Sequence, residues 1–100
     1  MNKKYRKLED YLYKKLQNSD YVLAYLNAAL ADQDKQVFLI ALKNVLEAQE
    51  QDLTALAEET DISRQNIYRI LSPKGNPRWE NITSIMNAMD LQINVSFKGK

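Results

Sequence analysis

One hundred residues suffice for a single compact domain, since a domain usually takes roughly 100 to 200 residues. With 45% hydrophobic residues, 27% charged residues, two Gly and two Pro, the composition favours helices over a many-turned β fold. The chain has no Cys and no His, which excludes disulfides and argues against zinc, haem and most nucleophilic chemistry. We therefore expect no enzyme activity, no metal and no cofactor. The charged N-terminus and the lack of an 18-residue apolar run predict a soluble, cytoplasmic protein that does not enter a membrane.

The apolar spacing of the first half of the chain predicts three helices. A first helix is expected from about residue 5 to 16, because apolar residues recur every three or four positions. Ser19 or Asp20 is expected to cap a second helix that stops near Asp32. Asp34 is expected to cap a third helix, which continues to Ala48 and should be the central packing helix.

The second half of the chain predicts three further helices and one strand. Short helices are expected from Asp52 or Thr54 to Thr60 and from Ser63 to Leu71, followed by a loop over Ser72–Pro77 that holds both prolines. Apolar residues from Ile82 to Met89 mark a sixth helix. Alternating apolar and polar residues from Leu91 to Phe97 then predict a half-buried strand.

Charge is unevenly distributed although the net charge is only +1. Residues 44–61 hold six anions and no cation, whereas residues 62–79 hold four cations and no anion. A local basic segment of this kind favours contact with phosphate. Two solvated helix faces would give the same pattern, so the charge alone leaves both interpretations open.

The two short helices around residue 61 are the most informative feature, because only about three residues separate them. Ala57 leaves room for close helix packing, Ile62 fills the turn, Ser63 can cap the second helix, and Ile67 and Ile70 can anchor it inward. This pattern predicts a helix-turn-helix whose second helix protrudes toward the DNA major groove.

The outer face of that second helix carries residues suited to reading bases, namely Arg64, Gln65, Asn66, Tyr68 and Arg69. Arg pairs with guanine, and Gln or Asn pairs with adenine. Lys74 and Arg78, in and after the next loop, are candidates to hold phosphates. Short helical hairpins also occur in modules that bind only proteins, and this alternative remains open.

Three phrases of the sequence carry a resemblance to a known family: YRKLEDYLYKKLQNSDYVLAYLNAAL, DKQVFLIALKNVLEAQ and LTALAEETDISRQNIYRILSPKGNPRWENI. From Tyr5 to about Phe97 the chain resembles the addiction-module antidote proteins, which are antitoxins with a phage-repressor-like (Xre-type) helix-turn-helix. The resemblance implies an all-helical DNA-binding protein that neutralises a small co-encoded toxin and represses its own operon. It places the base contacts at Arg64, Gln65, Tyr68 and Arg69, with Asn66 as a neighbouring candidate. Asp61 stands where such motifs usually have Gly, although Asp tolerates a left-handed backbone better than most residues.

The remaining conspicuous residues have structural interpretations. Trp79 is expected to pack rather than to insert between bases, and the basic N-terminal residues Lys3 to Lys7 are expected to be solvated. Tyr11, Tyr13 and Tyr21 are candidate anchors for the toxin, because the first two helices are the best surface left for a protein partner.

The expected fold is all-α, with about six helices, a phage-repressor-like helix-turn-helix and one short C-terminal strand. It forms one domain over residues 1–100, with a helical extension at 5–31, a DNA-binding core at 34–89 and the strand at 91–97. Because a lone strand seeks a partner, we expect a homodimer that binds double-stranded DNA at an inverted-repeat operator. The alternatives are a stand-alone transcriptional regulator and a protein-interaction module without DNA binding.

Overall fold

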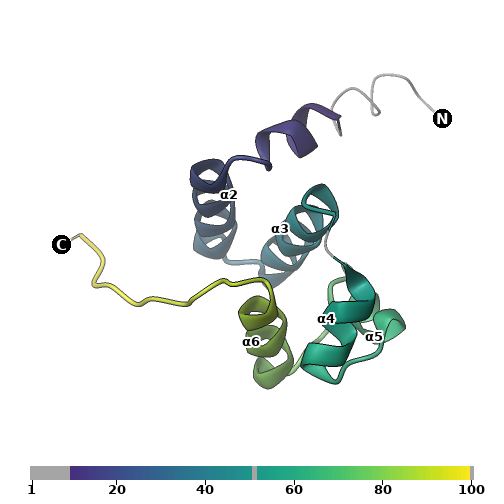
Figure 1. The fold of residues 1–100 in the computed structure, drawn as a ribbon. Helices are drawn as coiled ribbons and strands as arrows, with labels where there is room; N and C mark the ends of the chain where they lie inside the picture. Colours follow the sequence, from purple (N-terminus) through teal and green to yellow (C-terminus); the bar gives the residue numbers. More distant parts are fainter. Residues whose placement is uncertain (1–9, 51, 100) are drawn as a thin grey trace.

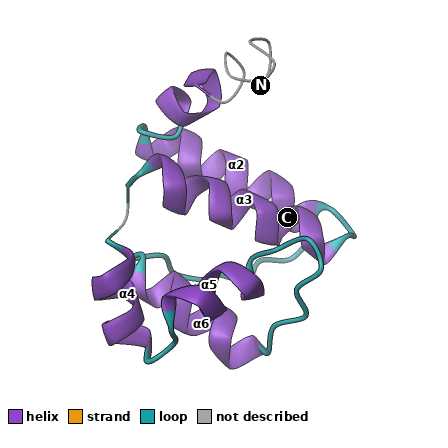
Figure 2. Cartoon of the chain, turned by 90° about the vertical axis from the view of Figure 1, so that its right-hand side faces the viewer, coloured by secondary structure: helices purple, strands orange, loops and turns teal. Residues whose placement is uncertain are grey.

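The computed structural model describes residues 10–50 and 52–99, and its regular structure over these ranges is entirely helical (Figures 1 and 2). A helical stretch over residues 10–15 comes first. Five longer helices follow it: α2 (Ser19–Ala31), α3 (Lys35–Ala48), α4 (Leu53–Thr60), α5 (Arg64–Ile70) and α6 (Trp79–Ala88). The all-α prediction is therefore confirmed. The expected start of the first helix at residue 5 lies outside the described residues.

Side chains that accept a hydrogen bond from a first-turn amide fix where four of the helices begin. Asp34, Asp52 and Ser63 cap α3, α4 and α5 as the sequence predicts, with N···O distances of 2.9 Å to Gln36, 3.0 Å to Thr54 and 3.2 Å to Asn66. Such caps satisfy amides that have no partner inside the helix.

The start of α2 differs slightly from the prediction. Ser19 or Asp20 was expected to cap this helix, but Asn18 does so by accepting from the amide of Tyr21 at 3.1 Å. Asn and Ser are nearly equivalent caps, so spacing alone does not choose between neighbours. The end of α2 at Ala31, with Asp32 as its C-cap, agrees with the prediction.

The hydrophobic core is centred on α3, as expected. Seven of its 14 residues are buried: Phe38, Leu39, Ala41, Leu42, Val45, Leu46 and Ala48. This core also includes Leu16 before α2, Ile67 on α5 and Ile85 on α6, which are all completely buried. Burying a Leu or Ile side chain contributes about 1.5–3 kcal/mol relative to leaving it exposed. The N-terminal helices and the α4–α5 region therefore share one core.

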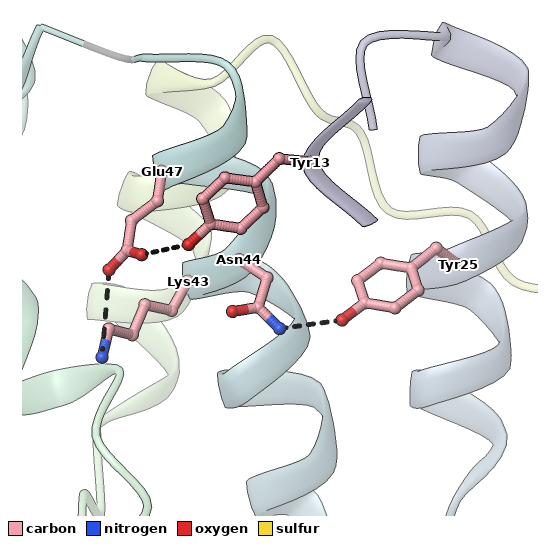
Figure 3. Close-up of polar contacts among 5 residues, drawn as sticks. All are labelled: Tyr13, Tyr25, Lys43, Asn44 and Glu47. Carbon is pink, nitrogen blue, oxygen red and sulfur yellow. Dashed lines mark hydrogen bonds and ion pairs between the residues drawn. The ribbon is translucent and has the colours of Figure 1, made fainter. Parts of the chain in front are cut away.

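Polar contacts join the N-terminal helices to one side of α3 (Figure 3). The Tyr13 hydroxyl donates to Glu47 Oε2 at 2.7 Å, and Asn44 Nδ2 donates to the Tyr25 hydroxyl at 2.9 Å. Lys43 Nζ lies 3.9 Å from Glu47 Oε1. Tyr13 is thus half-buried and bonded to α3, so it is less accessible to a partner than the other two tyrosines predicted as anchors.

The predicted C-terminal strand is absent from the described residues. Residues 91–97 leave α6 as an extended segment, which Figure 1 shows passing below α2 and away from the body of the molecule. Its start is held by the Leu91 amide, which donates to the Met86 carbonyl at 2.8 Å. The alternating pattern is real, but a strand needs a neighbouring strand for its backbone groups, and the described chain supplies only helices and loops.

Candidate nucleic-acid interface

A three-residue connection joins α4 to α5. Asp61, the first of the three, has φ 60° and ψ 25°, which is the left-handed conformation expected for this position. Thr60 Oγ1 donates to the Leu56 carbonyl at 2.8 Å and accepts from the Ile62 amide at 3.2 Å. The second of these bonds satisfies the Ile62 amide, which follows the end of α4 and has no partner in that helix.

Apolar side chains hold this helix pair against the rest of the molecule. Leu56 on α4 is 3% exposed and Ile67 on α5 is completely buried, while Ala57 and Ile62 are half-buried and pack against the same core. The residues predicted to face inward therefore do so. Anchoring at Ile67 fixes which side of the short α5 remains outside.

That outer side carries all five residues predicted to read bases. Arg64, Gln65, Asn66, Tyr68 and Arg69 are exposed on α5. Within the described residues, neither arginine takes part in a salt bridge. The guanidinium groups are thus available to donate two hydrogen bonds each to a partner such as the edge of guanine or a phosphate.

The two predicted phosphate contacts differ in their surroundings. Lys74 is exposed in the loop after α5. Arg78 is exposed as well, but its Nη1 atom lies 3.6 Å from Glu80 Oε1. Surface ion pairs of this kind contribute about 0–1 kcal/mol, so phosphate could displace Glu80 at small cost. Lys74 is the stronger candidate of the two.

Gly75 is needed for the path of this loop, although the sequence indicates only that a loop is present. A Cβ atom at this position would lie 2.3 Å from the Ile70 carbonyl oxygen and 2.9 Å from that of Arg69. Only glycine allows the loop to approach the end of α5 so closely. The loop is also tied to α3, because Lys35 Nζ donates to Asn76 Oδ1 at 2.7 Å. Lys74 is therefore held beside α5 by a defined backbone.

A second candidate surface lies at the N-terminal end of the described chain. Tyr11 is 62% exposed and Tyr21 is 38% exposed, and the two line one groove together with Lys14 and Lys15. Lys15 Nζ lies 5.4 Å from the centre of the Tyr11 ring. Two of the three tyrosines expected to anchor a protein partner are thus exposed on one surface.

Trp79 departs from its expected role as a packing residue. It is the first residue of α6 and is 69% exposed. The N-cap position before it, Arg78, makes no side-chain capping bond. The apolar period of α6 is carried by Ile82, Ile85 and Met86, so Trp79 is not needed to close the core.

Two further features, metal-holding groups and membrane-spanning helices, are absent from the part of the chain that the structure describes. No group of three or more Asp, Glu, Cys or His residues is arranged there to hold a metal ion. No helix among the described residues is both long enough and apolar enough to cross a bilayer.

Comparison with known proteins gives two matches. A family model described as "Probable addiction module antidote protein" matches residues 7–97. A protein of Haemophilus influenzae, described only as an uncharacterized protein, is 30% identical over 80 residues, which cover 80% of each chain. No solved structure matches the chain significantly.

Proposed function

Because the chain belongs to the family of probable addiction module antidote proteins, we propose that it is a DNA-binding antitoxin without catalytic activity. In this proposal it neutralises a small toxin encoded beside it and represses its own operon as a cytoplasmic homodimer. The family supports the antidote role and implies a cognate toxin. The case for DNA binding comes from the residues of α4, α5 and the loop that follows.

The main support for DNA binding is that one side of α5 is buried in the core and the other side is exposed. Its Ile67 side chain is completely buried, whereas Arg64, Gln65, Tyr68 and Arg69 are exposed. This is what a recognition helix requires: an apolar side that fixes its position and a polar side that meets base edges. With α4 and the tight turn at Asp61, it supports an Xre-type helix-turn-helix.

On DNA, α5 would enter the major groove. Arg64 and Arg69 would donate to the O6 and N7 atoms of guanine, and Gln65 or Asn66 would pair with adenine. Lys74 would bind a phosphate and fix the register of α5 along the duplex. In a homodimer, two such helices would bind an inverted repeat with half-sites about 34 Å apart or a multiple of that distance.

A titration of the full-length protein with DNA tests this proposal. The probe is a labelled duplex that covers the region upstream of its own gene, and a shuffled duplex of the same composition is the control. We expect tighter binding to the upstream duplex at physiological salt, with a steep loss as salt rises. Equal affinity for both duplexes would contradict sequence-specific binding. No affinity for either duplex would favour the alternative that the chain is a protein-interaction module without DNA binding.

The antidote role is tested separately with the small protein encoded by the adjacent reading frame. Co-expression should restore growth if that protein is toxic and is neutralised by this chain. Absence of any such reading frame would favour a stand-alone regulator. We place the toxin contact on the N-terminal helices, where Tyr11 and Tyr21 are exposed.

A further inference from the structure

An apolar groove lies between the C-terminal end of α2, the start of α6 and the extended segment 91–97. It has a volume of about 460 Å³. Three of its lining residues are large and exposed, with exposed fractions of 69% for Trp79, 53% for Leu30 and 41% for Ile93. Its floor contains the buried residues Phe38 and Met86. A continuous apolar surface with an exposed Trp is typical of a protein interface.

The same side of the molecule also presents a projecting apolar segment. Val95 is 95% exposed and Phe97 is 82% exposed. Figure 1 shows this segment leaving the helices on the side away from α4 and α5. Ile93 already lines the groove, and an extended chain advances about 3.4 Å per residue, so Phe97 lies up to about 14 Å beyond it. The segment therefore carries its last apolar side chains past its own groove.

We propose that this groove binds the C-terminal segment of a second copy of the chain, so that Val95 and Phe97 of each copy cover the groove of the other. The inference rests on the proposed homodimer and names its interface. A groove and a projecting apolar segment on one face are self-complementary, which is the requirement for a two-fold interface.

The area available agrees with a dimer. An aromatic side chain buries roughly 150–250 Å², so covering Trp79 and Phe97 in both copies removes on the order of 600 Å² from water. Stable interfaces begin at about 1,200 Å² in total. Leu30, Ile93 and Val95 are also exposed and would add to this area in the proposed dimer. Because α5 lies on the other side of the molecule, the dimer leaves both recognition helices uncovered (Figure 1).

Sedimentation of the full-length protein over a range of concentrations tests the interface without DNA or toxin. We expect a dimer for the natural chain, and a loss of dimer affinity by roughly tenfold or more for Phe97→Asp and for Trp79→Ser. Tyr11→Asp is the matched control, since it changes an exposed aromatic residue on another surface and should leave the dimer intact. Circular dichroism should show the same helix content for all of these proteins.

The absence of cysteine from the chain permits a direct test of the exchange. Leu30→Cys and Phe97→Cys proteins are prepared separately, mixed under reducing conditions and then oxidised. A mixed disulfide dimer is expected, whereas a mixture of Tyr11→Cys and Phe97→Cys should give none. A natural chain that is monomeric would overturn the homodimer. If Phe97→Asp and Trp79→Ser both leave the protein dimeric, and if the Leu30–Phe97 cross-link does not form, the proposed interface is wrong. The proposal of DNA binding would be unaffected, because the titration with DNA tests it separately.

Discussion

Gly75 lies so close to the Ile70 carbonyl that a Cβ atom there would come within 2.3 Å of the oxygen. Gly75→Ala must therefore push the loop away from the end of α5. We expect a loss of about 1–3 kcal/mol in the free energy of unfolding, measured by urea denaturation, together with weaker DNA binding. Gly99→Ala is the control for backbone strain without steric contact, because nothing lies within 4 Å of a Cβ atom at that position while its φ of 73° disfavours a side chain. Equal stability of the two variants would show that the loop relaxes freely.

Arg64→Ala and Arg69→Ala should reduce sequence discrimination. Each arginine is exposed on α5, so its loss should leave the fold unchanged while costing roughly 1–3 kcal/mol of operator binding. The measurement is a titration on the upstream duplex and on the shuffled duplex. The same loss on both duplexes would assign these arginines to phosphates rather than to bases.

Lys74→Ala should behave differently from the arginine variants. Lys74 is held in the loop after α5, where a phosphate contact is expected, and such a contact does not depend on sequence. Affinity should fall by a similar factor on every duplex, and the salt slope should decrease by about 1. Lys14→Ala, which removes an exposed lysine from the N-terminal helix, should leave both quantities unchanged.

Asp61 adopts a left-handed conformation that is costly for residues with a Cβ atom. Asp61→Ala should lower the free energy of unfolding by about 1 kcal/mol, because Ala tolerates φ near 60° less well than Asp. Asp61→Gly should be at least as stable as the natural protein. Thermal denaturation of the three proteins in parallel gives the order, and an Ala variant more stable than the Gly variant would contradict this account.

Tyr11→Ala should weaken toxin binding if the N-terminal surface is the site of neutralisation. The side chain is 62% exposed, so its removal should not disturb the core. We expect a loss of about 1–2 kcal/mol in calorimetric titration with the toxin. Ile40→Ala is a suitable control, because Ile40 is 40% exposed on α3 and does not line the groove that holds Tyr11 and Tyr21. Undiminished binding by a Tyr11→Ala, Tyr21→Ala double variant would exclude this surface.

The sequence predicts local structure well where one residue type has one physical role. Asp34, Asp52 and Ser63 cap helices because their side chains accept from nearby amides, and the burial of Ile67 follows from the period of α5. The exposure of the predicted base-reading residues follows from the same period. These features depend on neighbours within one or two turns.

The wrong predictions concern contacts over longer distances. Leu91–Phe97 has a strand's alternation, but whether it forms a strand depends on a partner that the described chain does not provide. Tyr13 was predicted only as a candidate anchor for a partner, and its hydrogen bond to Glu47, 34 positions away, was not foreseen. Trp79 was expected to pack against the core, yet its side chain is largely exposed. None of these contacts can be inferred from residues nearby in sequence.

Leu16 is completely buried in the core that also contains Ile67 of α5. Val22 and Leu26 on α2 extend this core from the same side. Cutting the chain between α2 and α3 and losing its N-terminal part would therefore expose the side of the central helix α3 that α2 covers, as well as removing the candidate toxin surface. A single proteolytic cleavage at this place would then end both neutralisation of the toxin and repression of the operon, so the cell would lose the two activities at the same time.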